Sequence, residues 1–546
     1  MTEKLLLTTS VIAITAVSFL WFPGHTILQS DTQIYIPILE QLWDPAALTR
    51  DLVATNPHVT YTVYDEMALL LRRVTGLGFE HVLMGEQIVY RAIGIVGLLL
   101  IGLGTGLSPP MAVAVAGIVS LGANVNGPAV LTVEYEPVPR GFALPFLLLS
   151  LGLVANGRPN WAALAAGVAF LFHPPTALAF YCVLGLVLLW QRKWRGALIL
   201  IASAMLMAVF AWSQPGVHQH QDLFGRIDPE LEKLQRMRAS YNWVSLWIGR
   251  FWAHYLFLWT VGLAAYFRVR NSVPPALRVL FTALPAIGAI SVPVSYLLTE
   301  QLKWSLMPQF QPGRYLLFIT LFAMLLSAIA AVKAGRERRW VESALFFAVA
   351  FAPAMAGDLF TRGTINNLPL LTALALIAMG LAVHKSAVAT VMVLPFLLIP
   401  TIGKVQNYAP VHTAELNAVA QWARTSTPQD AMFQFANFGQ QPEPGIFRAR
   451  SVRALYVDWK GGGQVNFMRQ FADEWWYRFQ KVQQPLSLTD YKALGVDFVV
   501  FKDKERLKDF EPVYENARYV VYRPSNVHNL ARVFVEDLAG DGGGCR

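Results

Sequence analysis

The sequence predicts a polytopic α-helical membrane protein that ends in a separate α/β domain. Hydrophobic residues make up 55% of the 546 residues and charged residues only 14%, and the mean hydropathy is +0.42. Because soluble domains usually carry about 25% charged residues, this composition indicates that most of the chain lies in a membrane. After about residue 405 charged residues become frequent, and short helix and strand patterns alternate. We therefore expect two domains, 1–404 and 405–546.

The apolar part contains roughly thirteen segments that are long enough, or nearly long enough, to cross a bilayer. They lie at residues 4–22, 87–107, 111–131, 138–155, 161–173, 175–190, 196–213, 251–267, 277–298, 314–332, 341–357, 367–383 and 387–403. The first is predicted to be a span rather than a signal peptide, because its apolar core exceeds the usual length of about 7–15 residues. Segment 161–173 is short and ends in His173-Pro174-Pro175, which is compatible with a membrane-embedded hairpin together with 175–190.

The orientation follows from three basic connectors, because Lys and Arg are enriched in cytoplasmic loops. Counting spans places all of these basic residues on one face: Arg192, Lys193, Arg195, Arg268, Arg270, Lys333, Arg336, Arg338 and Arg339. The N-terminus is then cytoplasmic. The opposite face carries the C-terminal domain and the loops 23–86, 132–140, 214–250, 299–313 and 358–366.

Charge and cysteine content exclude two other classes of protein. The net charge of +9 comes partly from the cytoplasmic loops, and no basic cluster is interleaved with aromatic residues, so we expect no nucleic-acid partner. The two cysteines lie far apart, Cys182 in an apolar segment and Cys545 in the Gly-rich tail. We therefore predict neither a disulfide nor a cysteine-based metal site.

Two short helices are predicted in the first outward loop. Residues 34–42 are apolar with polar interruptions and are followed by Asp44-Pro45. Residues 64–74 repeat apolar side chains at helical spacing, with charged residues on the opposite face. Such an amphipathic helix can lie flat in the membrane interface. Packing against the spans is an equally open alternative.

The C-terminal domain is predicted to mix helices and strands. The helices are expected at 415–424, 467–482 and 488–495, and the strands, rich in aromatic and β-branched residues, at 431–436, 454–457, 496–501 and 517–522. About 120 residues are enough for a hydrophobic core. Trp475-Trp476-Tyr477 is expected to pack into that core rather than to stack on sugars. The run from Asp458 to Gly463 lacks the spacing of a P-loop.

Acidic residues provide the candidate catalytic groups. Asp31 follows the first span directly, where the chain enters its long outward loop, although an isolated loop carboxylate is usually only a solvated charge. Glu134 and Glu136 lie in the next loop on the same face, and Pro137 and Pro139 restrict the backbone beside them. Nearby carboxylates can act as base and acid, or bind a divalent cation through oxygen. A plain polar hairpin between two spans is the alternative.

Basic residues on the same face provide candidate phosphate ligands. Arg314 begins a span, and arginine binds phosphate through paired hydrogen bonds and stays charged. We therefore predict that Arg314 binds a lipid phosphate, the alternative being an interfacial anchor. Arg140, Lys303 and Arg362 are expected in the same layer. His173 lies at the mouth of a span, although a lone histidine is more often structural.

This layout resembles the GT-C class of integral-membrane glycosyltransferases. In that class an acidic residue follows the first span, which Asp31 matches, and the first loop holds two helices, which 34–42 and 64–74 match. Glu134 and Glu136 match its second acidic loop. The tail phrases WARTSTP and YKALGVDFVV are similar to phrases in the tail domains of such proteins. The pattern Asp31…Tyr35…Asp44-Pro45…Asp51 resembles an uncharacterised bacterial family with this layout.

The sequence departs from two types of GT-C enzyme at the motifs that characterise them. Thr32 follows Asp31, where protein mannosyltransferases have an acidic doublet. No WWDYG-like phrase follows the tail helix, which disfavours oligosaccharyl transfer to asparagine. The acceptor therefore stays open.

The resemblance implies transfer of a sugar from a polyprenyl-phosphate donor to an acceptor hydroxyl, on the periplasmic face of a bacterial inner membrane. Asp31 would be the general base of an inverting displacement. Glu134 or Glu136 would orient the acceptor or, with Asp31, hold a divalent cation such as Mg or Mn. The predicted ligands of the donor phosphate are Arg314, Arg140, Lys303 and His173, and the predicted sugar or acceptor contacts are Tyr35 and Tyr135.

Two other functions stay open at this point. A transporter or lipid flippase needs ionisable groups near the middle of the membrane and paired broken helices. The central parts of the predicted spans contain few charges, and no two similar halves are visible. A non-catalytic assembly scaffold would instead present its tail domain to partners.

Overall fold

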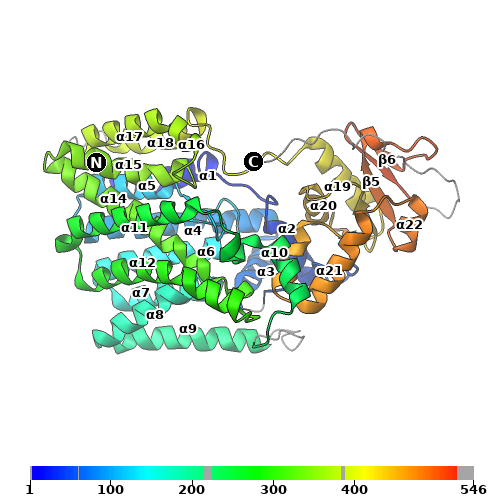
Figure 1. Ribbon diagram of the computed structural model, residues 1–546, viewed down its shortest axis with the longest axis horizontal. Helices are drawn as coiled ribbons and strands as arrows, with labels where there is room; N and C mark the ends of the chain where they lie inside the picture. The colour runs from blue at the N-terminus through cyan, green and yellow to red at the C-terminus, as the bar shows by residue number, and fades with distance from the viewer. Residues whose placement is uncertain (1–2, 60, 214–223, 383–387, 525–546) are drawn as a thin grey trace. The chain divides into compact units, whose positions relative to one another are not determined.

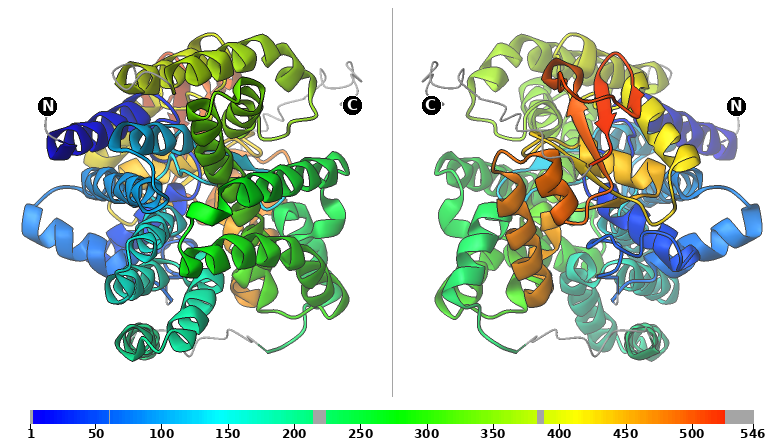
Figure 2. Two further views of the ribbon diagram at one scale, coloured as in Figure 1. Left: turned by 90° about the vertical axis from the view of Figure 1, so that its left-hand side faces the viewer. Right: turned by 90° about the vertical axis from the view of Figure 1, so that its right-hand side faces the viewer.

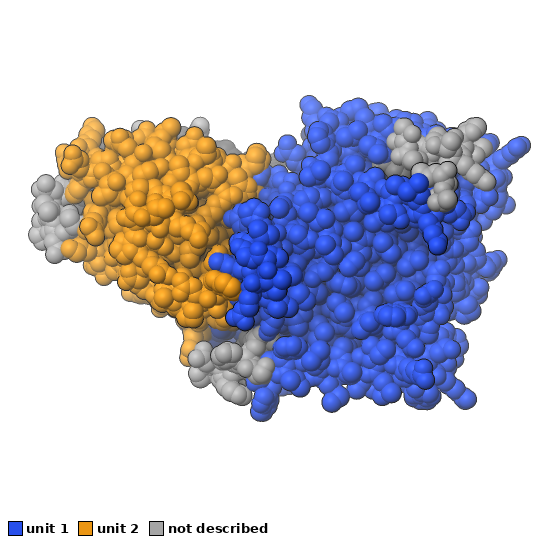
Figure 3. All heavy atoms as spheres, turned by 180° about the vertical axis from the view of Figure 1, so that it is seen from behind, with its two compact units in different colours: residues 1–27, 58–409, 466–469 blue, residues 28–57, 410–465, 470–546 orange. Residues whose placement is uncertain are grey.

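The structure is a computed structural model that describes residues 3–59, 61–213, 224–382 and 388–524 (Figure 1). The chain divides into two compact units, which Figure 3 shows in different colours. Unit 1 contains residues 1–27, 58–409 and 466–469, and unit 2 contains residues 28–57, 410–465 and 470–546. Residues 28–57, which the predicted boundary at 404/405 left with the spans, therefore belong with the tail.

Unit 1 is almost entirely helical, and most of its helices run alongside one another (Figures 1 and 2). Its helices are α1 (Glu3–Leu20), α3 (Tyr64–Thr75), α4 (Phe79–Gly104), α5 (Pro109–Ser120), α6 (Pro139–Ala155), α7 (Pro159–Phe172), α8 (Pro174–Trp190), α9 (Trp194–Ser213), α10 (Pro229–Arg238), α11 (Arg250–Val269), α12 (Pro275–Ser295), α13 (Met307–Phe310), α14 (Leu316–Arg336), α15 (Trp340–Met355), α16 (Arg362–Asn366), α17 (Leu368–Leu381) and α18 (Val388–Thr401). Each predicted apolar segment overlaps one of these helices.

Five helical stretches among the described residues are long and apolar enough to cross a membrane: Glu3–Leu20, Phe79–Gly104, Trp194–Trp212, Pro275–Gln301 and Met307–Arg336. The chain is a multi-pass membrane protein. Several other apolar helices are shorter, so the number of spans and their orientation stay predictions. The last of the five stretches includes α14, which is buried from Leu316 to Val332 and packs against α5, α11, α12 and α15.

Small residues let α4 and α6 approach closely, as is common between membrane helices. A Cβ atom at Gly97 would lie 2.4 Å from the Leu148 carbonyl carbon, and one at Gly104 would lie 2.6 Å from the Ala155 side chain. The α4–α6 contact is the scaffold on which the loop 132–138 is built.

The hydropathy pattern predicted one helix over the apolar segment 111–131, and this prediction is wrong. Helix α5 ends at Ser120, and the chain then forms a short antiparallel hairpin of β1 (Asn124–Val125) and β2 (Val130–Leu131). Gly122 and Gly127 have positive φ angles of 72° and 89°, which favour glycine. These turns end the helix although the sequence stays apolar.

Helix α3 begins at Tyr64 as predicted, and its apolar side chains are only partly covered. Leu70 is 55% exposed and Val74 is 74% exposed, whereas Asp65 is buried. This pattern favours the membrane-interface alternative, because a helix packed on the spans would bury Leu70 and Val74.

Unit 2 is an α/β unit built on a five-stranded mixed sheet with the order β4-β3-β5-β7-β6. Its strands are β3 (Met432–Phe435), β4 (Ala454–Leu455), β5 (Phe498–Lys502), β6 (Tyr514–Glu515) and β7 (Tyr519–Tyr522). Strands β3, β4 and β5 are parallel, and β7 pairs antiparallel with β5 and β6. Its helices are α2 (Thr32–Trp43), α19 (Ala414–Ser426), α20 (Glu443–Ser451), α21 (Arg469–Val482) and α22 (Leu488–Ala493). Four strands and three helices coincide with predicted elements, and α20 and β6 were not predicted.

Candidate functional site

In unit 1, the loop that carries Glu134 and Glu136 is held by side chains of neighbouring segments. The buried Arg91 of α4 donates to the carbonyl oxygens of Glu134 (2.8 Å) and Gly24 (3.1 Å), and Gln87 donates to the Glu134 carbonyl (3.0 Å). The hydroxyl of Tyr64 donates to the Pro137 carbonyl at 2.8 Å. The loop is therefore fixed from several sides, beyond the stiffness that its prolines supply.

Glu134 and two arginines line one small pocket in unit 1. The Nε atom of Arg140 lies 2.7 Å from Oε1 of Glu134, whose side chain is buried. Arg314 lines the same pocket, together with apolar residues and Thr176. Two guanidinium groups line this pocket, and guanidinium N–H groups are the donors that bind phosphate and carboxylate anions.

His173 lies at the edge of this cluster, between α7 and α8, so 161–173 and 175–190 form two separate helices. Its Nδ1 atom accepts a hydrogen bond from the backbone N–H of Thr176 at 3.1 Å, which assigns the proton of the neutral ring to Nε2. Burial, with the positive charges of Arg314 and Arg140, holds the pKa of His173 well below its usual range. The imidazole is therefore neutral, and it can donate a hydrogen bond but adds no positive charge.

Arg314 lies in a short 3-10 turn, Pro312–Tyr315, that directly precedes α14. A Cβ atom at Gly313 would lie 2.9 Å from the Trp247 ring, so only glycine lets the turn pack this closely. The guanidinium carbon of Arg314 lies 5.9 Å from the centre of the Tyr241 ring. Aromatic contact of this kind helps to fix the orientation of an arginine.

Lys303, predicted to bind phosphate with Arg314, belongs to a different cluster. Its Nζ atom lies 2.6 Å from Oε2 of Glu232, and Glu232 also pairs with Arg236 at 2.8 Å. This cluster joins the loop after α9 to the segment after α12, because the Ile227 N–H donates to the Lys303 carbonyl at 2.7 Å. The charge of Lys303 is thus satisfied within the protein.

A second, mainly apolar pocket adjoins the arginine pocket. Both are lined by Glu134 and Leu144, and the second extends along α4, α5, α6 and α14. Its apolar lining includes Ile95, Leu98, Val119, Leu148 and Leu321. An arginine-lined pocket next to an apolar one has the chemistry to take a ligand with an anionic head and a hydrocarbon tail.

In unit 2, Asp31 precedes the first residue of α2 and its side chain is 28% exposed. Its Oδ1 atom lies 2.6 Å from Nζ of Lys460, which also donates to the Ser30 hydroxyl at 2.9 Å. Lys460 begins the glycine-rich 3-10 segment Lys460–Asn466. This segment lacks the spacing of a P-loop, and nothing in the local sequence pattern indicates a partner for Asp31.

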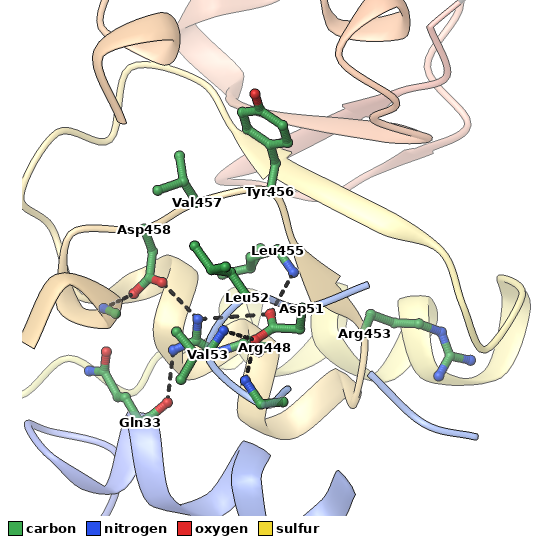
Figure 4. Close-up of polar contacts among 12 residues, drawn as sticks. Gln33, Asp51, Leu52, Val53, Arg448, Arg453, Leu455, Tyr456, Val457 and Asp458 are labelled. Atoms are coloured by element: carbon green, nitrogen blue, oxygen red, sulfur yellow. Dashed lines mark hydrogen bonds and ion pairs between the residues drawn. The ribbon is translucent and has the colours of Figure 1, made fainter. Parts of the chain in front are cut away.

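Unit 2 also contains a buried group of charged residues. It includes Asp51, Arg448 and Asp458 (Figure 4). Arg448 is 1% exposed; its Nη1 atom lies 2.7 Å from Oδ1 of Asp458 and 3.9 Å from Oδ2 of Asp51. Burial raises the pKa of Asp51, while the neighbouring Arg448 opposes that rise. Burial alone would lower the pKa of Arg448, but Asp458 and Asp51 more than offset it and raise that pKa.

The other predicted site residues divide between the two units. Glu136 is buried in unit 1, and the Tyr135 ring packs against Tyr408 with 5.2 Å between ring centres. Tyr35 lies on α2 in unit 2, as does Asp31. Proximity of Asp31 to Glu134 or Arg314 therefore stays a prediction. Among the residues that the structure describes, no group of three or more His, Cys, Asp or Glu is placed to hold a metal ion.

Sequence reasoning missed Arg91, Lys460 and Arg448. Arg91 was assigned to an apolar segment whose middle was expected to be nearly free of charge, and α4 also contains the buried Glu86. Lys460 and Arg448 have no local signal, because their partners lie more than 400 residues away in the chain or in a separate segment.

Comparison with known proteins gives distant likenesses. A model of a domain of unknown function, DUF6798, matches residues 414–482. No curated protein sequence matches the chain. The oligosaccharyltransferase of Archaeoglobus fulgidus with a tethered acceptor peptide is 10% identical, with a TM-score of 0.44 over 92% of this chain and 69% of that one. The same protein, AglB, in complex with an inhibitory peptide and a dolichol-phosphate is also 10% identical, with a TM-score of 0.43 and the same coverage.

ArnT from Cupriavidus metallidurans bound to undecaprenyl phosphate is 15% identical, with a TM-score of 0.39 over 95% of this chain and 97% of that one. AglB and ArnT are both GT-C glycosyltransferases, the class that the sequence resembles. At these scores and identities the likenesses carry no argument about what this chain binds or catalyses.

Proposed function

We propose that the protein is a membrane glycosyltransferase that takes a sugar from a polyprenyl-phosphate donor. The observation that carries this proposal is the pocket lined by Arg314, Arg140 and Glu134, which adjoins an apolar pocket between membrane helices. A polyprenyl phosphate combines the two parts that these pockets suit, an anionic phosphate and a long hydrocarbon chain. Its sugar is bonded to that phosphate and would lie near the polar end.

The two arginines act on the leaving group. When the bond between the anomeric carbon and the phosphate oxygen breaks, the electron pair stays on the phosphate and its negative charge grows. Arg314 and Arg140 stabilise that charge, and preorganised donors of this kind supply much of the rate enhancement in enzymes. The neutral His173 contributes a hydrogen bond from Nε2. Lys303 has no role in this proposal, because it lies in a separate cluster with Glu232 and does not line the pocket.

Asp31 is the general base in this proposal. It takes the proton of the acceptor hydroxyl while the hydroxyl oxygen forms a bond to the anomeric carbon, and the polyprenyl phosphate leaves from the opposite side. Direct displacement inverts the anomeric centre. Glu134 or Glu136 orients the acceptor, and Tyr35 and Tyr135 contact the sugar or the acceptor. The acceptor side faces the periplasm of a bacterial inner membrane.

The replacement Asp31→Asn tests the base, because it keeps the shape of the side chain and removes its basicity. The protein is reconstituted in lipid nanodiscs and given labelled polyprenyl-phosphate hexoses and pentoses, with envelope membranes as the source of acceptor. We expect transfer to fall by about 10²–10⁴-fold, the usual contribution of a general base. Asp509→Asn, at an exposed carboxylate of unit 2, is the matched control and keeps the wild-type rate. Transfer by Asp31→Asn at the wild-type rate would contradict the mechanism.

The same reconstitution separates the other two functions. Movement of the labelled donor across a vesicle bilayer without sugar transfer identifies a flippase. A scaffold is identified if the combined replacement of Asp31, Glu134 and Arg314 leaves the cellular function intact while deletion of 410–546 abolishes it. Dependence on a divalent cation is measured by treating the active protein with EDTA and adding back Mg²⁺ or Mn²⁺.

A further inference from the structure

We propose that Lys460 is a positioning residue for Asp31, supplied by the tail segment of unit 2. This inference rests on the proposed function, in which Asp31 is the base. The pair is close, with 2.6 Å between Nζ of Lys460 and Oδ1 of Asp31, and both side chains are mostly covered, with 21% and 28% exposed. A charge-assisted contact of this length fixes the direction of a carboxylate more firmly than an exposed surface pair does.

The backbone around Asp31 is itself fixed. The Thr32 hydroxyl accepts a hydrogen bond from the Leu28 N–H at 2.6 Å, and the buried side chain of Gln33 donates to the Leu28 carbonyl at 2.7 Å. A Cβ atom at Gly445 would lie 2.1 Å from Oε1 of Gln33, so α20 approaches α2 closely only because residue 445 is glycine. Asp31 therefore starts a helix whose first turn cannot shift freely.

The segment that carries Lys460 is packed just as closely. A Cβ atom at Gly461 would lie 2.7 Å from the Val53 side chain, and one at Gly462 would lie 2.3 Å from the Trp475 ring. The indole N–H of Trp475 donates to the Asp458 carbonyl at 2.9 Å, and the Gly461 N–H donates to Oδ2 of Asp458 at 3.0 Å. The glycines at 461 and 462 are thus a packing requirement, which explains a glycine run that lacks the spacing of a P-loop.

One buried arginine connects the two fixed segments. Nη2 of Arg448 donates to the Gln33 carbonyl of α2 at 2.9 Å, and Nη1 lies 2.7 Å from Oδ1 of Asp458, two residues before Lys460 (Figure 4). Asp51 completes the group: its Oδ2 accepts the Leu455 N–H of β4 at 2.9 Å and its Oδ1 accepts the Val53 N–H at 3.0 Å. Arg448 therefore sets the distance between the Asp31 backbone and the Lys460 backbone.

This arrangement gives the tail a role in catalysis. A base must be held within a fraction of an ångström of the proton it takes, and an error of about 1 Å can cost about 10²-fold in rate. Lys460 holds the Asp31 carboxylate in one orientation, and the Arg448 network holds Lys460. The segment that matches the domain of unknown function, 414–482, contains both Arg448 and Lys460.

The test compares kcat and KM of Lys460→Met, Lys460→Arg and Lys508→Met with labelled polyprenyl-phosphate hexoses and pentoses as the probes. Lys508 is an exposed lysine of the same unit and is the matched control. We expect Lys460→Met to lower kcat by about 10–100-fold with the KM for the donor unchanged, because the donor phosphate is bound elsewhere. Lys460→Arg keeps a cation next to Asp31 and restores part of the loss.

A double-mutant cycle separates positioning from a purely structural effect. If Lys460 acts through Asp31, Lys460→Met causes no further loss in the Asp31→Asn background. The inference is overturned if Lys460→Met behaves like Lys508→Met, or if it lowers the residual rate of Asp31→Asn by the same factor as the wild-type rate. The proposed function fails in a different way: the wild-type protein then transfers no sugar from any of the donors, or Asp31→Asn transfers at the wild-type rate.

Discussion

Two arginine clusters in this molecule differ in how far the protein encloses their arginines. In unit 2, Arg448 is fully buried between two carboxylates, Asp51 and Asp458, and it also donates to a backbone carbonyl. In unit 1, Arg140 and Arg314 share a pocket with one carboxylate, Glu134. A fully buried arginine between two carboxylates has a structural task, whereas arginines that line a pocket and keep some exposure can contact an anion. The degree of enclosure, rather than the presence of arginine, therefore distinguishes the scaffold from the candidate site.

The largest expected effect concerns the buried cluster. Arg448→Met leaves Asp51 and Asp458 without their shared cation, and removing one partner of a buried ion pair usually costs about 3–5 kcal/mol of stability. Hydrogen exchange of the β3 and β4 amides, measured by mass spectrometry in detergent, reports the free energy of opening. The matched control is Arg506→Met, which removes an arginine paired with Glu515 at the surface and should leave exchange unchanged. Equal exchange in both variants would show that Arg448 does not stabilise unit 2.

The next effect concerns the pocket of unit 1. Arg314→Met removes a charge-assisted contact to a phosphate, worth about 1.5–3 kcal/mol, which corresponds to roughly 10–100-fold weaker binding. The measurement is the affinity of the reconstituted protein for a labelled polyprenyl phosphate, and protein stability should change little because Arg314 is partly exposed. Arg195→Met, at an exposed arginine near the start of α9, is the control and should bind normally. Unchanged affinity in Arg314→Met would show that Arg314 does not bind the phosphate.

The smallest effect is a dependence of stability on pH. Burial and the two arginines depress the pKa of His173 in the folded state. At a pH below about 6.5, the ordinary pKa of histidine, His173 therefore binds more protons in the unfolded chain than in the folded one. The stabilising contribution of neutral His173 is complete above about pH 6.5 and is lost as the pH falls from there, by at most about 1.4 kcal/mol per pH unit.

Hydrogen exchange of the α7 and α8 amides between pH 7.5 and 5, corrected for the intrinsic rate, measures this loss. His173→Asn keeps an acceptor for the Thr176 N–H but does not titrate, so it should flatten the pH dependence, whereas His81→Asn, at an exposed histidine, should not. An unaltered slope in His173→Asn would mean that His173 is not coupled to the arginine pocket.

Local patterns in the sequence predicted most elements but few contacts. The amphipathic repeat of 64–74 identified α3 nearly to the residue, and the β-branched and aromatic runs located β3, β4, β5 and β7. The apolar run 111–131 was misread as one helix, because hydropathy does not register the positive φ angles at Gly122 and Gly127. Similarly, α20 was missed because it begins in Pro442-Glu443-Pro444, which resembles a turn more than a helix.

In the candidate site, too, the sequence predicted some residues but not their contacts. Glu134, Arg140 and Arg314 were chosen as acidic or basic residues next to predicted spans, and the structure brings these three to one pocket. Lys303, chosen by the same rule, pairs with Glu232 instead, since a residue's distance from a span does not reveal its partner. The sequence could not predict the contact of Lys460 with Asp31. The local pattern at Lys460 shows only a glycine run, and these glycines are explained by packing against Val53 and Trp475.

The sequence by itself determined that this is a multi-pass helical membrane protein with an α/β tail, because composition, hydropathy and periodicity depend on residues close together in the chain. It also pointed to Asp31, through its place after the first apolar segment. Only the tertiary structure decided that residues 28–57 fold with the tail and that Asp31 lies beside Lys460. Contacts between residues more than 400 positions apart depend on how the whole chain packs, and no local pattern records them.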